Sequence, residues 1–215
     1  MSVTRLLRRL ADPADPTSAS ARFRRRRFEW FVEKLSVTHR DRILDLGGNE
    51  AAWLSTPYRD RVTVANIAPP PPTAVLPYVR ADACDLGSVF DTGAFDVVFS
   101  NSVIEHVGDP ARQKQFGDEV RRVGRRYWVQ TPYRHFPVEP HFLFPLFQYL
   151  PPAGQRWVGL RWKYSHLKRN GEDVLDELSR LRLLDRRELR AIFPDAALLS
   201  ERVLGLTKSL VAFRA

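Results

Sequence analysis

Five short apolar runs occupy the middle of the chain, and each is followed by polar or small residues. They read RILDL at 42–46, RVTVANI at 61–67, LPYVRAD at 76–82, FDVVFSN at 95–101 and RYWVQTP at 126–132. Runs of this length, rich in β-branched and aromatic residues, are typical of strands that are buried on both faces. We therefore expect a mostly parallel sheet whose carboxyl edge carries the loops that contact a ligand.

Helical patterns and a final pair of strands surround these runs. We expect helices over 2–10, 18–35, 48–55, 109–124, 171–184 and 185–194, and a closing hairpin over 196–205 and 206–215. Asp185 and Glu188 stand at the spacing of a capping box, which predicts the start of the last helix. Four consecutive prolines at 69–72 exclude a helix between the second and third strands. The fold class is thus α/β: a Rossmann-like, seven-stranded, mostly parallel sheet with helices on both faces and a final antiparallel hairpin.

Length and charge set the domain organisation. The chain has 215 residues and a net charge of +9, and eight arginines fall within residues 1–27. We divide it into a basic N-terminal arm at 1–20 and one domain at 21–215, with an insertion rich in aromatic residues and proline at about 133–170. No apolar stretch has the length of a signal or transmembrane segment, so we expect a cytoplasmic protein. Cys84 is the single cysteine, and its expected role is packing.

Candidate ligand contacts follow four consecutive strands. Gly47 and Gly48 come directly after the first strand, where the lack of a side chain lets backbone amides approach a ligand. Asn66 ends the second strand, Asp82 ends the third, and Asn101 and Ser102 end the fourth. An amide or carboxylate at such an edge can bond ribose hydroxyls or an adenine amino group. Their regular spacing predicts one nucleoside-like ligand across the edge.

This arrangement resembles the class I S-adenosylmethionine-dependent methyltransferases, in particular the type 11-like group with a VIEHV-like segment, here at 103–107, after the fourth strand. The resemblance covers roughly residues 25–215. It implies S-adenosylmethionine as cofactor, held by Asp45, Gly47, Gly48, Asn66, Ile67, Asp82, Ala83, Asn101 and Ser102. The chain departs from the family pattern in two places: DLGGNEA lacks the later glycines of the first loop, and Asn66 stands where the family commonly has an acid.

Histidines and carboxylates near the carboxyl edge are the candidates for catalysis. Transfer of a methyl group to a hydroxyl needs a base or a cation, because a neutral hydroxyl is a poor nucleophile. We expect His141 or His106 to act as the base and Glu139 to orient the acceptor. Glu105 and His106 are also candidate ligands for Mg²⁺.

These features favour an O-methyltransferase that acts on a hydroxyl of a small molecule or a saccharide, with Mg²⁺ assistance as one option. An alternative is a nucleic-acid methyltransferase whose Arg22–Arg27 run contacts phosphates. A second alternative is a non-catalytic scaffold on the same fold. The aromatic insertion fits either an acceptor pocket or a homodimer contact.

Overall fold

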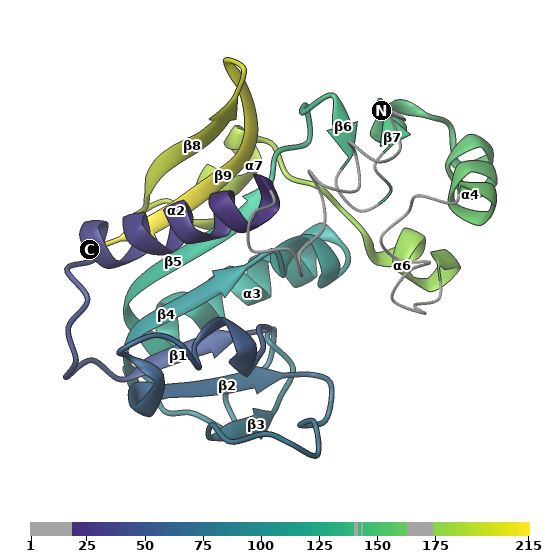
Figure 1. The fold of residues 1–215 in the computed structure, drawn as a ribbon. Coiled ribbons are helices and arrows are strands. Elements are labelled where there is room, and N and C mark those ends of the chain that lie inside the picture. The colour runs from purple at the N-terminus through teal and green to yellow at the C-terminus, as the bar shows by residue number, and fades with distance from the viewer. Residues whose placement is uncertain (1–18, 140–141, 143, 163–173) are drawn as a thin grey trace. The chain divides into compact units, whose positions relative to one another are not determined.

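The computed structural model describes residues 19–139, 142, 144–162 and 174–215 (Figure 1). The chain divides into two compact units, residues 1–38 with Ala215 and residues 39–214. In the first unit, helix α2 (Ala19–Lys34) confirms the helix expected over 18–35. Within it, the Arg26 guanidinium lies 4.6 Å from the centre of the Trp30 ring. The helix expected over 2–10 lies outside the described residues.

The second unit is built on one seven-stranded sheet. Its strands are β1 (Ile43–Leu46), β2 (Val62–Asn66), β3 (Tyr78–Arg80), β4 (Phe95–Asn101), β5 (Gly124–Pro132), β8 (Ala197–Val203) and β9 (Leu206–Arg214). The strands lie in the order β3-β2-β1-β4-β5-β9-β8, which can be followed in Figure 1. Strands β1 to β5 pair in parallel, and β9 is antiparallel to both β5 and β8. The predicted sheet and its final hairpin are confirmed.

Two helices form the core with one face of this sheet. Helix α3 (Pro110–Val123) begins at Asp109, whose side chain accepts a hydrogen bond from the Arg112 amide at 2.9 Å. Helix α7 (Arg186–Ile192) begins with the predicted capping box of Asp185 and Glu188. Their apolar side chains join those of β1, β4, β5 and β9 in one buried cluster, which includes Leu44, Leu46, Val98, Tyr127, Val129, Phe116, Val120, Leu189, Leu210 and Ala212. Burial of this cluster is the main force that holds the sheet edge in place.

The expectation of a helix over 48–55 is wrong. This segment forms only a short 3-10 turn at Glu50–Ala52. The Glu50 carboxylate accepts hydrogen bonds from the amides of Val75 and Leu76 in the loop before β3, at 2.8 and 3.1 Å. Pro57 follows closely, and a proline disfavours the helical conformation of the residue that precedes it. The segment is therefore held by contacts outside itself, and too few residues remain for a full helix.

The predicted insertion forms a small structure of its own. It contains strands β6 (Val138–Glu139) and β7 (Phe144–Pro145), a 3-10 turn at Phe147–Tyr149 and helix α4 (Pro152–Arg161), and helix α6 (Val174–Arg180) follows. The rings of Phe142 and Phe147 stack with their centres 4.1 Å apart. With Val158 they form a second buried cluster. Among the described residues, no helix combines the length and apolar character needed to span a membrane.

Candidate cofactor site

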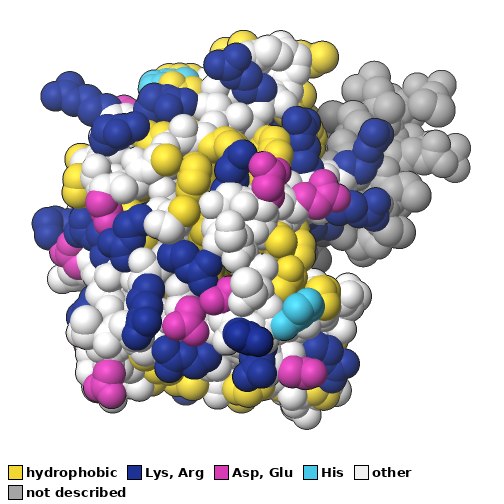
Figure 2. Space-filling view, turned by 90° about the vertical axis from the view of Figure 1, so that its left-hand side faces the viewer, with side chains coloured by type: hydrophobic (Ala, Val, Ile, Leu, Met, Phe, Trp, Pro, Cys, Tyr) yellow, Lys and Arg dark blue, Asp and Glu magenta, His cyan; other side chains and the backbone are white. Residues whose placement is uncertain are grey.

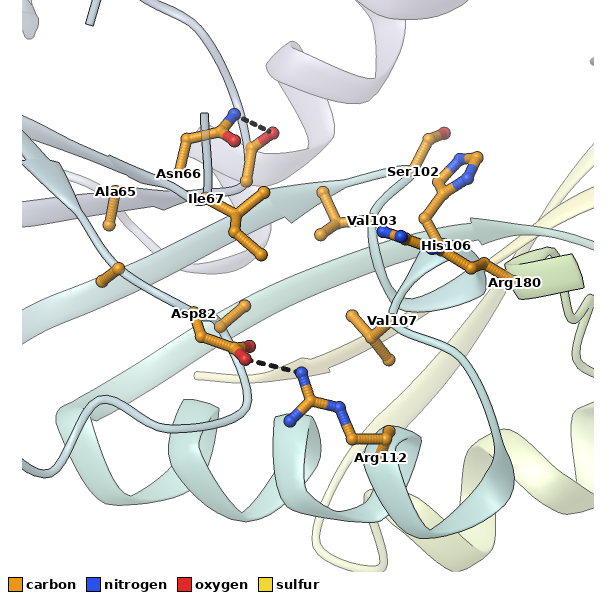
Figure 3. A pocket seen from close by; sticks show the side chains of 13 residues that line it. Ala65, Asn66, Ile67, Asp82, Ser102, Val103, His106, Val107, Arg112 and Arg180 are labelled. Atoms are coloured by element: carbon orange, nitrogen blue, oxygen red, sulfur yellow. Dashed lines mark hydrogen bonds and ion pairs between the residues drawn. The ribbon is translucent and has the colours of Figure 1, made fainter. Parts of the chain in front are cut away.

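A cavity of about 430 Å³ opens at the carboxyl edge of β1, β2, β3 and β4. Its volume lies in the range of pockets that hold drug-sized ligands. The described lining residues are Gly47, Ala65, Asn66, Ile67, Ala81, Asp82, Ala83, Ser102, Val103, His106, Val107, Arg112 and Arg180. In Figure 3, Ser102, His106 and Arg180 lie together at the end opposite Ala65 and Asn66, with Ile67 and Val103 between the two ends. The cavity thus has polar groups at both ends, with the apolar side chains of Ile67 and Val103 and the Asp82–Arg112 pair between them (Figure 3).

Gly47 turns the chain sharply at the end of β1. Its φ of +79° is a conformation that favours glycine, and a Cβ atom there would lie 2.5 Å from a methyl carbon of Val103. Its amide donates a hydrogen bond to the Ala65 carbonyl at 2.7 Å. This turn lets the backbone form the cavity wall.

Asn66 fastens the glycine turn to β2. Its side-chain nitrogen donates to the carbonyls of Gly47 and Gly48, at 3.0 and 2.9 Å, and its side-chain oxygen accepts from the Ala68 amide at 3.1 Å. Both hydrogens of the side-chain amide therefore form hydrogen bonds with the glycine turn. The oxygen keeps one lone pair that can accept a ribose hydroxyl. A carboxylate at this position would have offered two acceptor atoms but no donor for the loop.

Asp82 forms an ion pair inside the cavity. Its Oδ2 accepts from the Arg112 guanidinium at 2.6 Å, and its Oδ1 accepts from the Cys84 amide at 2.9 Å (Figure 3). Partial burial acts to raise the pKa of Asp82, but the hydrogen bonds from Arg112 and Cys84 and the positive charge of Arg112 outweigh it and lower the pKa. The carboxylate is therefore ionised at neutral pH and oriented toward the cavity.

Asp45, which we expected among the cofactor contacts, is not one of the described residues that line the cavity. It is 2 % exposed, and its Oδ2 accepts from the Trp53 indole nitrogen at 2.8 Å. The Trp53 ring also packs edge-on against Phe99. Burial raises the pKa of Asp45 to about 7, although the hydrogen bond from Trp53 acts in the opposite direction. The structure thus gives Asp45 a role in packing the first loop.

We expect the Asp45→Asn variant to gain stability relative to the wild type at pH 8 but much less at pH 5. An unfolded aspartate loses its proton near pH 3.9, whereas folded Asp45 keeps it to about pH 7. The contribution of Asp45 to the free energy of unfolding is therefore largest at low pH and decreases as the pH rises to about 7. Between pH 5 and 8 the wild type loses roughly 2–3 kcal/mol through Asp45. Asparagine still accepts the bond from Trp53 and does not titrate.

Urea unfolding of both proteins at the two pH values measures this difference. Asp96→Asn is the matched control: the hydrogen bond from Arg42 lowers the pKa of Asp96, so this carboxylate is ionised in both the folded and the unfolded state at pH 5 and pH 8, and the stability difference of the variant is expected to be the same at both. An Asp45→Asn variant with equal stability differences at pH 5 and pH 8 would contradict the expectation.

Glu105 and His106 lie in the 3-10 turn Ile104–His106 that follows β4. Glu105 is fully buried, and its Oε2 accepts from the Thr131 hydroxyl at 2.9 Å. Its Oε1 has no hydrogen-bond partner among the described residues and lies 3.9 Å from Nε2 of His106. A buried carboxylate oxygen without a donor is costly, so a donor at this position is strongly favoured. The imidazole of His106, which lines the cavity, is the nearest one in this turn.

Ser102 lies beside this histidine in a strained conformation. Its φ is +58°, which is uncommon for a residue other than glycine. The Ser102 hydroxyl donates to Oε1 of Gln130 at 3.0 Å, and the Ser102 amide donates to the Gln130 carbonyl at the same distance. These bonds to β5 hold the turn that carries Val103 and His106.

The structure brings together part of the predicted site. Seven of the expected residues line the cavity: Gly47, Asn66, Ile67, Asp82, Ala83, Ser102 and His106. Gly48 and Asn101 lie near it but are not among the described lining residues. Arg112 and Arg180 line it and were not anticipated, because in the sequence they read only as solvated positions on helices.

Those predicted catalytic and metal residues that the structure describes do not gather in one place. Glu139 is buried in β6 and lines a different cavity, so it is not beside His106. His141 lies outside the described residues. No group of three or more His, Cys, Asp or Glu suited to a metal ion occurs in the described part of the chain. The predicted ligand pair of Glu105 and His106 therefore needs further ligands from elsewhere to hold Mg²⁺.

Comparisons with known proteins agree with this fold. Residues 47–126 match the family model described as a methyltransferase domain. Among curated proteins, none matches the sequence.

Solved structures show the same fold at low sequence identity. A SAM-dependent methyltransferase from Methanosarcina mazei is 14% identical, with 85% of this chain and 94% of that chain covered and a TM-score of 0.51. A protein from Pyrococcus horikoshii is 16% identical, with coverages of 98% and 96% and a TM-score of 0.54. A protein described as a zinc-dependent alcohol dehydrogenase, from Rhodobacter sphaeroides, is 9% identical, with both coverages 87% and a TM-score of 0.58. Such likenesses show the Rossmann-like fold alone.

The family match begins at Gly47, in the glycine turn, and extends through the turn that carries Glu105 and His106. The segment that carries most of the cavity residues thus matches a methyltransferase domain, and the fold is similar to that of a solved SAM-dependent methyltransferase.

Proposed function

We propose that the protein transfers a methyl group from S-adenosylmethionine to a hydroxyl group of a small molecule or a saccharide. The observation that carries this proposal is the buried Glu105 carboxylate behind His106, at the wall of the cofactor cavity. A hydroxyl acceptor must lose its proton during transfer, and an imidazole backed by a carboxylate is a common base for that step. An acceptor that is already ionised would not need this pair.

The cavity residues fit the cofactor that the family uses. The Asn66 side-chain oxygen accepts a hydrogen bond from one ribose hydroxyl through its remaining lone pair. The Asp82 carboxylate, which is paired with Arg112, accepts a hydrogen bond from the adenine amino group. Ala65, Ile67 and Ala83 provide apolar wall near these groups. When bound, S-adenosylmethionine supplies a methyl group already activated by its sulfonium. What remains for the protein is to align the acceptor, exclude water and take up one proton.

In this proposal His106 accepts the hydroxyl proton on its Nδ1, directly or through a water molecule, while its Nε2–H faces Glu105, which stabilises the resulting imidazolium. The present distance of 3.9 Å between Glu105 Oε1 and His106 Nε2 is too long for a hydrogen bond. Catalytic hydrogen bonds are often long before substrate binds and shorten in the complex. Arg180 lies close to His106 in the cavity and offers a cation for the carboxylate arm of the cofactor (Figure 3).

Two measurements test the proposal. Calorimetric titration with S-adenosylhomocysteine is expected to show one site per chain. Transfer of tritiated methyl groups to fractionated cell extract is then expected to label hydroxyl-bearing small molecules or saccharides. Label in the RNA fraction, lost when Arg22, Arg25 and Arg26 are neutralised, would instead support the nucleic-acid alternative. In Figure 2, Lys and Arg side chains are interspersed with Asp, Glu and apolar groups over the visible face.

Addition of EDTA separates the base from the metal option. Transfer that relies on His106 is expected to continue unchanged in EDTA. Loss of activity in EDTA, restored by Mg²⁺, would favour the metal-assisted version. Absence of binding to S-adenosylhomocysteine would leave only the non-catalytic scaffold.

A further inference from the structure

A second, smaller cavity lies between the insertion and the segment that follows α6. Its volume is about 190 Å³, roughly six times the 30 Å³ that a water molecule occupies in the liquid. It is lined by Arg134, Glu139, Phe147, Gln148, Gln155, Leu178, Leu181, Arg182 and Leu183. A cavity of this size has room for about one sugar ring.

The second cavity is adjacent to the first. The Arg182 amide donates to the Glu105 carbonyl at 2.8 Å. The Gln113 side chain donates to the carbonyls of Ile104 and Arg182, at 3.0 and 2.9 Å. The turn that carries His106 is therefore bonded directly to the segment that walls the second cavity, while Arg180, two residues earlier, lines the first.

The polar groups of the second cavity require hydrogen-bond donors from a ligand. Oε1 of Gln148 is buried and has no hydrogen-bond partner among the described residues. The nitrogen of the same side chain donates to the carbonyls of Arg134 and Phe136, at 3.0 and 2.8 Å, which fixes the direction of its oxygen. Glu139, 1 % exposed, adds a carboxylate whose Oε2 accepts from the Phe142 amide at 2.8 Å. An orphaned acceptor such as the Gln148 oxygen is satisfied by a hydroxyl or an amino group.

The charged groups of the second cavity bear on whether the ligand offers hydroxyl groups or a charged amino group. Arg134 and Arg182 both donate to the Glu188 carboxylate, at 2.8 and 2.5 Å. Arg134 and Arg182 line the same cavity as Glu139, and with Glu139 and Glu188 as the matching carboxylates neither sign of charge is in excess among these groups, so none of them favours an ammonium group over a neutral ligand. An anion such as phosphate is repelled by the Glu139 carboxylate. A neutral ligand with several hydroxyls matches both the acceptors and the guanidinium donors.

The apolar side of the cavity suits the same ligand. The ring of Phe147 is held by stacking against Phe142 at 4.1 Å between ring centres. Leu178, Leu181 and Leu183 complete the apolar wall. A sugar ring presents both an apolar C–H face and a rim of hydroxyls, which is the combination that this cavity offers.

We propose that the second cavity binds one sugar unit of a hydroxyl-rich acceptor, next to the unit that receives the methyl group. This inference rests on the proposed function, because it assigns the acceptor of the same reaction to the saccharide class. Glu139 and Gln148 accept from its hydroxyls, and Gln155 and the arginines donate to them. The sequence had placed Glu139 near the acceptor for a different reason, as a partner of His141 and His106.

Saturation-transfer NMR tests the proposal on the full chain with excess S-adenosylhomocysteine to occupy the first cavity. The probes are methyl α-D-glucopyranoside, methyl α-D-mannopyranoside and maltose, with cyclohexanol and inorganic phosphate as mismatched ligands. We expect at least one saccharide to bind and neither mismatched ligand to do so. We expect Glu139→Gln to weaken saccharide binding by about tenfold or more, and Gln155→Ala by about threefold to tenfold.

Arg156→Ala is the matched control, since Arg156 is exposed on the same helix as Gln155 and does not line the cavity. All three variants are expected to keep the wild-type affinity for S-adenosylhomocysteine, which also shows that they fold. No saccharide binding, or saccharide binding that both cavity variants leave unchanged, overturns the proposal. A failure of S-adenosylhomocysteine binding in the wild type would instead remove the proposed function, so the two failures are distinguishable.

Discussion

Replacement of His106 by alanine is expected to lower the rate of methyl transfer by about 10²- to 10⁴-fold while the affinity for S-adenosylhomocysteine changes little. The magnitude is that of a lost general base. The imidazole lines the cavity at the end opposite Asn66, so its removal takes away the proton acceptor without disturbing the ribose end. Single-turnover rates and calorimetric titration on the same preparation separate the two effects.

Two companion variants show whether His106 acts as a base. His39→Ala removes an exposed histidine that stacks on Tyr58 at 5.3 Å, and we expect it to leave the rate unchanged. Glu105→Gln keeps an acceptor for the Thr131 hydroxyl but removes the charge behind the imidazole. We expect it to lower the rate of methyl transfer, because the imidazolium that forms during transfer loses its neighbouring negative charge. Wild-type rates in His106→Ala, or no gain in rate when free imidazole is added, would contradict the assignment.

The sheet was predictable because its strands are separated by residues with strong local preferences. The proline run at 69–72 and the caps at Asp109 and Asp185 end or begin elements whatever their surroundings. The ends of four strands then gave most of the cavity, because parallel strands bring their carboxyl ends to one edge. Asn66, Asp82 and Ser102 were found in this way.

Long-range contacts account for what the sequence pattern did not predict. The segment 48–55, where we expected a helix, contains Trp53, and the neighbouring sequence does not indicate that the Trp53 indole donates a hydrogen bond to buried Asp45. Arg112 reads as a solvated position in the first turn of a helix until the fold places it opposite Asp82, thirty residues earlier. Glu139 and His106 follow adjacent strands, yet they line different cavities because β6 buries the glutamate in the insertion.

The second large effect is expected from Asn66→Asp, which restores the type of residue that the family commonly has at the end of the second strand. The resemblance alone predicts tighter binding, because an acid accepts ribose hydroxyls more strongly than an amide. The structure predicts the opposite. An aspartate has no donor for the carbonyls of Gly47 and Gly48, which now accept from Asn66 at 3.0 and 2.9 Å.

Loss of these two hydrogen bonds, together with repulsion between a carboxylate and two carbonyl oxygens, amounts to about 2–3 kcal/mol. We therefore expect the affinity for S-adenosylhomocysteine to fall by roughly 30- to 150-fold. The Asn66 side chain gives two hydrogen bonds between the glycine turn and β2, and the Gly47 amide adds one to the Ala65 carbonyl. The loop that lacks the later glycines therefore depends on the Asn66 side chain.

Asn49→Asp is the matched control for this prediction. It makes the same chemical change two residues after Gly47, but the Asn49 side chain only accepts a hydrogen bond, from the Ala51 amide at 3.1 Å, and an aspartate accepts it equally well. We expect this control to retain its affinity within about threefold, because an exposed charge outside the cavity is screened by salt. Equal losses in both variants would mean that added charge, rather than the lost donor, weakens binding. Unchanged or tighter binding in Asn66→Asp would show that the carboxylate takes the ribose as in the family, and that the glycine turn holds its shape without the amide.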